Sequence, residues 1–134
     1  MNIVKYQGIF FDTSATAMIK DNSTVLLENL IANPHITFEY KPEHCIPSEL
    51  FSKEYNIHIL SEGNDGTNHG YKVIIPEELK RYYFGADMPH ITISIGANAK
   101  PINTALIKFD VNKEFVVKGK IGYCLYNDTV VTQK

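Results

Sequence analysis

The alternation of apolar and polar residues predicts that strands make up much of the chain. Residues 3–11 are rich in Ile, Val, Tyr and Phe, and residues 55–60 and 71–75 share this β-rich composition. Residues 61–70 between them are dense in Gly, Asn, Asp and Ser, which predicts a hairpin with a long loop. The expected strands are residues 3–11, 35–40, 55–60, 71–75, 90–96 and, as one strand or two, 114–126.

A second periodicity, with apolar residues three and four positions apart, predicts helices. Residues 23–33 carry Leu and Ile at this spacing and end before a proline, which indicates an amphipathic helix. Asp12 can cap a helix that follows the first strand. Residues 46–51 and 76–84 begin with a helix-compatible Pro, which predicts two short helices, whereas residues 103–109 are ambiguous. The expected class is α+β, with about six strands and three helices.

The composition is typical of one globular domain spanning residues 1–134. The chain is 44% hydrophobic and 21% charged, and its aromatic content of 11% supplies a core without metal or disulfide staples. Its apolar runs are far shorter than the roughly 20 residues that cross a bilayer, and the first residues lack a secretion-signal pattern. We therefore expect a cytoplasmic protein with no membrane contact, in which Cys45 and Cys124 are free thiols.

The charge balance limits the class of partner. Thirteen Lys and Arg against fifteen Asp and Glu give a formal net charge of -2. A protein that binds long stretches of phosphate backbone usually carries a basic field, so long duplex nucleic acid is not an expected partner. Residues from Lys108 onward have a mild basic bias, which would suit a short anionic ligand.

The tetrapeptide PHIT occurs twice, at residues 34–37 and 89–92. Each copy lies at the start of an expected strand, where successive side chains point to opposite faces. The expected polar faces are His35, Thr37 and Glu39 in the first strand and His90, Thr92 and Ser94 in the second, and the expected core faces are Ile36, Phe38 and Tyr40, and Ile91, Ile93 and Ile95. Each strand would thus present a histidine and a threonine together on a rigid element.

Two histidines suit acid–base chemistry near neutral pH, because an unperturbed imidazole titrates at about 6.5. One ring can accept a proton while the other donates one, and the two threonine hydroxyls can hold the non-bridging oxygens of a phosphate. No acidic cluster surrounds either motif, so we expect no metal ion and no other cofactor. A solvated polar face is the usual explanation of a single motif of this kind, but the repetition favours chemistry.

The paired H-x-T motifs resemble those of the 2H phosphoesterases, and the turn at residues 47–51 and the Gly-rich and Asn-rich hairpin agree with that family. The resemblance implies a bilobal α+β fold, with two antiparallel sheets related by a pseudo-twofold axis around a central cleft and helices outside. It is closest to the branch that contains Swiss-army-knife RNA-repair-like proteins and phage anti-CBASS phosphodiesterases. It implies that His35, Thr37, His90 and Thr92 are the catalytic residues of a metal-independent phosphodiesterase.

The same resemblance implies a substrate class. The expected ligand is a cyclic oligonucleotide second messenger or a short RNA-like molecule, and the implied role is immune evasion by destroying a bacterial defence signal. In the phage branch the nucleophile is the ribose 2′-hydroxyl of the substrate, and in other branches it is water. The alternatives are an RNA-processing 2′,3′-cyclic phosphodiesterase and a non-catalytic protein that sequesters nucleotides. The sequence leaves open which histidine is the base.

Several residues outside the motifs are candidates for substrate binding. The chain has no Trp, so a base-stacking partner must be Tyr or Phe. Tyr6, Phe11 and Tyr123 are the candidates, although each also suits the core. Lys100 and Asn103 follow the second motif and can reach a phosphate or a base edge, or remain solvated. The other histidines, His44, His58 and His69, lack metal-ligand spacing and are expected on the surface or in loops.

Overall fold

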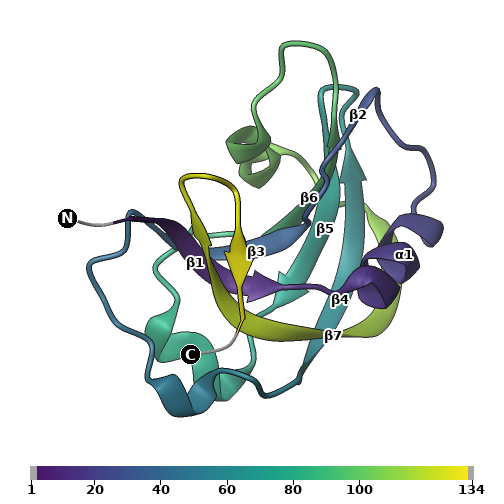
Figure 1. The fold of residues 1–134 in the computed structure, drawn as a ribbon. Helices are drawn as coiled ribbons and strands as arrows, with labels where there is room; N and C mark the ends of the chain where they lie inside the picture. Colours follow the sequence, from purple (N-terminus) through teal and green to yellow (C-terminus); the bar gives the residue numbers. More distant parts are fainter. Residues whose placement is uncertain (1–2, 133–134) are drawn as a thin grey trace.

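The chain forms an antiparallel sheet that curls into a half-barrel, with few helices (Figure 1). The computed structural model describes residues 3–132. Within this range the strands are hydrogen-bonded in the order β2-β6-β5-β4-β7-β1-β3, and β8 pairs with β7. The strands are β1 (Val4–Phe10), β2 (Asn29–Leu30), β3 (His35–Tyr40), β4 (Tyr55–Asn64), β5 (Asn68–Ile74), β6 (His90–Ile95), β7 (Val111–Leu125) and β8 (Val130–Val131). The expected α+β class is confirmed.

The longest strand, β7, belongs to both parts of the curled sheet. Its first part pairs with β4 as far as Gly119, which lies opposite Tyr55. Its second part pairs with β1 from Lys120, which lies opposite Phe10. The run expected over residues 114–126 is therefore one strand, and its change of partner lets the sheet bend.

The hydrophobic core follows from the strand alternation that the sequence predicts. Side chains from β1, β3, β4, β5, β6 and β7 meet on one face, and α1 (Thr13–Asp21) adds Ala15 and Ile19 to the same cluster. Its fully buried isoleucines are Ile9, Ile19, Ile36, Ile57, Ile59, Ile91, Ile93 and Ile121. Burial of each of these side chains contributes about 1.5–3 kcal/mol to the stability of the fold. Because the isoleucines of the motif strands must face the core, His35, Thr37, His90 and Thr92 point to the opposite side of those strands.

The helices predicted after prolines are shorter and tighter than expected. The Asp12 side chain accepts a hydrogen bond from the Ala15 backbone at 2.8 Å, which confirms the predicted cap of α1. The two helices expected after prolines are short 3-10 helices, η1 (Ser48–Leu50) and η2 (Glu77–Tyr82), and neither has a side-chain cap at its start. The ambiguous segment, residues 103–109, begins inside a third 3-10 helix, η3 (Pro101–Leu106). No helix of the described residues is long and apolar enough to cross a bilayer.

The helix predicted over residues 23–33 is wrong. This segment is extended, and its residues Asn29–Leu30 form β2 along the edge of β6. Tertiary partners outweigh the helical spacing: the Leu27 backbone N–H donates to Ser94 Oγ at 2.9 Å, and the Ile31 N–H donates to the Ile93 carbonyl at 2.9 Å. The segment thus covers an edge that would otherwise expose unpaired backbone groups.

The long hairpin loop predicted over residues 61–70 is also wrong, because β4 and β5 continue through it to a short turn. Asp65 accepts hydrogen bonds from the Thr67 and Asn68 backbones at 2.9 and 2.8 Å. Gly66 takes a φ of 89°, which a side chain would disfavour. The turn is therefore confined to residues 65–67, and the polar residues on either side of it belong to β4 and β5.

Candidate active site

The two motif strands are paired to their neighbours in the same way. In one half His35 lies opposite Phe10 and Thr37 opposite Gly8, across β3 and β1. In the other half His90 lies opposite Lys72 and Thr92 opposite Gly70, across β6 and β5. A Cβ at either glycine would collide with the backbone carbonyl of the isoleucine in the facing motif. Glycine is therefore required for the close approach that holds each motif in register.

A β-bulge follows each motif and corrects the predicted faces. Thr37 and Glu39 lie opposite consecutive residues of β1, so Phe38 is the additional residue. The alternation is reversed beyond it: Glu39 is buried, and Tyr40, predicted in the core, is 57% exposed. A register shift lies at the equivalent position of β6, since Thr92 and Ser94 face the consecutive residues Gly70 and His69. Ser94 is therefore fully buried as well. Only the histidine and threonine of each motif keep the expected polar orientation.

The motif histidines are oriented by identical backbone contacts. The Nδ1 atom of His35 lies 2.9 Å from the Asn33 carbonyl oxygen, and that of His90 lies 2.7 Å from the Met88 carbonyl oxygen. Because a carbonyl only accepts, Nδ1 must carry the proton in both rings. Each neutral ring therefore has its Nε2 lone pair available for proton transfer.

The half-buried rings of His35 and His90 line one cavity of about 670 Å³ between β3 and β6, which contact each other. Among the lining residues the only Lys or Arg is Lys5, and there is no Asp or Glu. The wall is completed by Tyr6, Thr37, Tyr40, Tyr83, Phe84, Gly85, Ala86, Pro101 and Ile102. The cavity is thus largely aromatic and apolar, with a single fixed positive charge.

Burial lowers the pKa of both motif histidines below the ordinary value, although the carbonyl contacts raise it in part. For His35 the nearby His90 and Lys5 lower the pKa further. The His35 ring also stacks on Tyr6, with ring centroids 4.4 Å apart, and on Phe10 at 5.6 Å. The two imidazoles therefore have the same orientation but different surroundings.

The motif threonines also differ. Thr37 lines the cavity, and its hydroxyl has no hydrogen-bond partner among residues 3–132. The Thr92 hydroxyl lies 2.9 Å from Thr104 Oγ1 and 3.2 Å from the Pro101 carbonyl oxygen, both in η3. Thr37 can therefore bind a ligand oxygen directly, whereas Thr92 holds η3 beside the cavity.

The structure brings together only some of the predicted site residues. Tyr6 lines the same cavity as His35, Thr37 and His90. Thr92 is not in the lining, and its hydroxyl is bound to Thr104 of η3 instead. Lys100 and Asn103 are exposed at η3 and are not in the lining, unlike the intervening Pro101 and Ile102. These placements leave Lys100 and Asn103 as predictions without a contact to the cavity.

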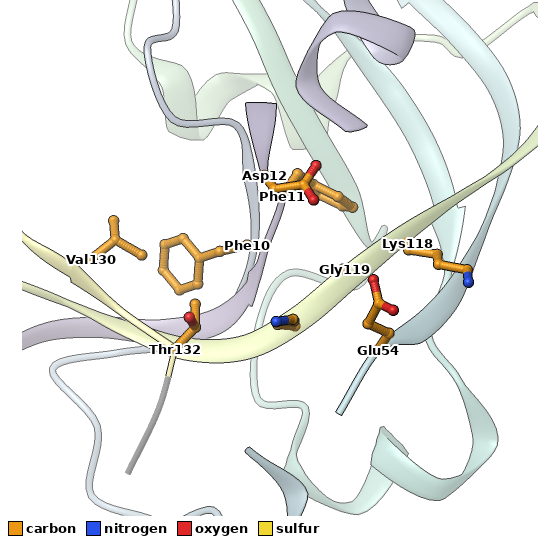
Figure 2. Close-up of a pocket in the computed structure, with 9 residues that line it drawn as sticks. Phe10, Phe11, Asp12, Glu54, Lys118, Gly119, Val130 and Thr132 are labelled. Carbon is orange, nitrogen blue, oxygen red and sulfur yellow. The ribbon is translucent and has the colours of Figure 1, made fainter. Parts of the chain in front are cut away.

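The other two aromatic candidates lie in separate pockets. Phe11 lines a pocket of about 200 Å³ with Asp12, Glu54 and Lys118 (Figure 2). Tyr123 lines another pocket and packs edge-on against Phe51, with centroids 6.2 Å apart. Neither ring is therefore placed to stack on a ligand held by the two histidines.

The sequence did not indicate several lining residues, notably Lys5, Tyr40, Tyr83 and Phe84. The Phe84 N–H donates to the Phe38 carbonyl at 2.7 Å, which places residues 83–86 beside β3. This contact joins segments far apart in the chain, and no local pattern encodes it.

The remaining histidines have different environments. His58 is exposed on β4, as expected of a surface residue. The prediction for His69 is wrong, because it is fully buried with Nε2 2.7 Å from Glu62 Oε2 and Nδ1 2.8 Å from Ser94 Oγ. Burial alone raises the pKa of Glu62, but hydrogen bonds from His69 and Thr24 outweigh it and hold that pKa below its usual value. These partners make the buried polar cluster stable.

His44 lies in a loop, as expected, but it is not a free surface group. Its Nδ1 lies 2.9 Å from Glu39 Oε2, and its ring stacks on Phe84 with centroids 4.0 Å apart. Through this stack His44 supports Phe84, which is part of the aromatic wall of the cavity.

Among residues 3–132 no three His, Cys, Asp or Glu side chains are grouped closely enough to hold a metal ion.

No protein-family model and no curated protein matches this chain.

Proposed function

We propose that the protein is a metal-independent phosphodiesterase that uses two histidines for acid–base catalysis. The observation that carries the proposal is the paired orientation of His35 and His90: both direct Nδ1 at a backbone carbonyl and both line one cavity. Pairs of imidazoles held in this way can accept and donate protons within one turnover. Solvent exposure alone gives no reason for two such matched rings.

The proposed reaction moves one proton at each histidine. The Nε2 atom of one ring takes the proton of the attacking hydroxyl, either a ribose 2′-hydroxyl or water, as the new O–P bond forms. The Nε2–H of the other ring gives its proton to the leaving oxygen as the old O–P bond breaks. Thr37 donates to a non-bridging oxygen, and Lys5 offsets its negative charge. Proton exchange with solvent then restores both rings.

The strand pairing supports the bilobal fold that belongs to this proposal. The units β3-β1-β7 and β6-β5-β4 have corresponding registers, and they adjoin where β7 pairs with β4. In one unit Gly8 lies opposite Gly122, and in the other Gly70 lies opposite Gly63. We propose that a pseudo-twofold axis relates the two units, as in the 2H phosphoesterases.

The cavity supports a small substrate with flat rings. Its aromatic side chains can stack on nucleobases, and its single lysine matches few phosphates. Long RNA would need an extended basic track, which a net charge of -2 does not favour. We therefore propose a cyclic oligonucleotide signal as substrate, in the manner of anti-CBASS phosphodiesterases.

The decisive experiment is incubation with a panel of cyclic di- and trinucleotides and a linear 2′,3′-cyclic phosphate, in EDTA, followed by mass analysis of the products. Cleavage of a cyclic oligonucleotide is the expected result. Opening of the linear 2′,3′-cyclic phosphate alone would favour RNA processing. Tight binding of a panel member without turnover would replace the enzyme with a sequestering protein.

A further inference from the structure

We propose that Tyr6 is a positioning residue that keeps His35 neutral, so that His35 is the proton acceptor and His90 the proton donor. The inference rests on the proposed phosphodiester cleavage and adds a direction to it. It follows from an asymmetry between two halves whose backbones pair in the same register.

Aromatic rings cover the imidazole on the β3 side. The Tyr6 ring stacks on His35 at a centroid distance of 4.4 Å and an interplanar angle of 21°, and on Phe10 at 5.9 Å and 15°. The Tyr6 hydroxyl lies 3.5 Å from His35 Nδ1, which already donates to the Asn33 carbonyl. Two apolar ring faces thus exclude water from an imidazole whose positive form would need hydration.

The equivalent positions on the β6 side carry no rings. Asn68 takes the place of Tyr6 in the register, and its side chain donates to the Lys100 carbonyl at 2.8 Å and to Thr104 Oγ1 at 3.1 Å. Lys72 takes the place of Phe10 opposite His90. No aromatic contact to His90 occurs within residues 3–132. His90 therefore keeps more access to water than His35 does.

The charged and titratable groups around the two rings favour the same assignment. Lys5 of β1 and His90 of β6 both disfavour a proton on His35, and burial disfavours it most. Burial raises the pKa of the Tyr6 phenol well above its usual value, so this group does not compete as a base. Tyr40 of β3 and Tyr83 complete the titratable side chains of the cavity. The Asn33 carbonyl is the contact that favours a proton on His35, and burial outweighs it. The Nζ atom of Lys5 also lies 3.5 Å from Asp128 Oδ1 at the exposed end of β1, so Lys5 contributes less than burial does.

In the proposed step His35 Nε2 receives the proton of the attacking hydroxyl, and His90 Nε2–H protonates the leaving oxygen. His35 ends the step protonated and His90 ends it neutral. The Tyr6 ring stacked on His35 has its effect before proton transfer, because it raises the fraction of His35 that is neutral and can accept the proton. Tyr6 itself transfers no proton.

The first measurement is an NMR titration of the imidazole Cε1–H signals of the wild-type protein, assigned with His35→Ala and His90→Ala. We expect His35 to titrate at lower pH than His90. The opposite order would overturn the assignment. This measurement needs no turnover, so it separates failure of the inference from failure of the proposed function.

The second measurement compares Tyr6→Ser with Tyr6→Phe. Loss of the ring in Tyr6→Ser should raise the pH at which His35 titrates. The acidic limb of the kcat/KM profile should move to higher pH by the same amount, and kcat/KM on that limb should fall about tenfold for each pH unit of the move. Tyr6→Phe keeps the stack and should restore the wild-type limb. Tyr40→Ser removes another cavity tyrosine without a contact to His35 and should leave the titration of His35 in place. An unchanged His35 titration in Tyr6→Ser, with the thermal melt intact, would overturn the role of Tyr6.

Discussion

The β1–β3 half and the β5–β6 half place the same tetrapeptide on the same backbone frame, yet they surround it with different side chains. In the first half His35 lies against two rings, and the Thr37 hydroxyl has no hydrogen-bond partner among residues 3–132. In the second half no aromatic ring of the described residues contacts His90, and the Thr92 hydroxyl is bound to Thr104 of η3. The shared strand backbone therefore fixes the positions of the two histidines and the two threonines. The side chains around each motif determine whether its histidine accepts or donates a proton and whether its threonine can bind a phosphate oxygen.

The largest expected effect tests whether both halves are needed. His35→Ala or His90→Ala should each lower kcat by about 10² to 10⁴, because each removes one proton transfer. Folding and ligand affinity should change little, since neither ring supplies much of the cavity wall. Single-turnover kinetics and calorimetric binding on one cyclic oligonucleotide check this, with His58→Ala on the exposed face of β4 as control. Full activity in either variant would rule out the two-histidine mechanism.

The next effect concerns two buried acids, Glu39 on β3 and Glu62 on β4. Glu62→Ala should lower the free energy of unfolding by about 3–5 kcal/mol, because it leaves His69 and Thr24 without their shared acceptor in the core. Glu39→Ala should cost less, about 1–3 kcal/mol, because the partner side chain of His44 is 53% exposed and can be hydrated. Urea denaturation of both variants measures the difference. Equal losses would contradict this ranking.

The same carboxylate gives stability a pH dependence. The pKa of Glu62 is lower in the folded chain than in the unfolded chain, so its contribution is present above its ordinary pKa and is lost as pH falls through the folded value. Glu62→Gln should therefore show a flatter loss of stability on acidification than the wild type. Urea denaturation of both proteins from neutral to acidic pH measures this difference. If the free energy of unfolding fell with pH in parallel for the two proteins, Glu62 would not be the source of the pH dependence.

A smaller effect should separate the two threonines. Thr37→Ala removes a free hydroxyl from the cavity and should cost about 1–3 kcal/mol in kcat/KM with no loss of stability. Thr92→Ala releases η3 and should lower the thermal midpoint as well as kcat/KM. Thr→Ser at either site keeps the hydroxyl and serves as the matched control. Identical kinetic and thermal profiles for the two alanine variants would remove the distinction between the halves.

The smallest effect is the position of the pH optimum. Both motif histidines have a pKa lowered from 6.5, so the form with one neutral and one protonated ring is most abundant below that pH. We expect a bell-shaped kcat/KM profile with its maximum on the acidic side of neutral, unchanged by EDTA. A maximum in alkaline solution, or activity lost in EDTA and restored by Mg²⁺, would contradict the proposed chemistry.

The sequence predicts what local periodicity encodes. The strand over residues 35–40, the strand that begins at His90, the core isoleucines Ile36, Ile91 and Ile93 and the cap at Asp12 are present, whereas Ile95, predicted in the core, is only half-buried. The repeated PHIT tetrapeptide also located the two histidines that share the cavity. These features depend on residues within a few positions of one another, which is where sequence patterns carry most information.

The rest depends on partners far apart in the chain. Residues 23–33 have helical spacing, but the edge of β6 and the buried Ser94 draw them into an extended path. The bulges after the motifs were not visible either, so the directions of Glu39 and Tyr40 were reversed. Phe84 reaches the cavity through a backbone contact to Phe38. Tertiary hydrogen bonds decide each of these cases against the local preference.

The strand β7 has a consequence for the order in which the chain can fold as it is synthesised. Both β1 and β4 have β7 as a neighbour, and residues 111–125 are translated after every other strand except β8. Until they emerge from the ribosome, the hairpin of β4 and β5 and the pair of β1 and β3 have no strand to join them. Contacts of such long sequence separation form slowly, so we expect the cavity to assemble only after β7 has been released.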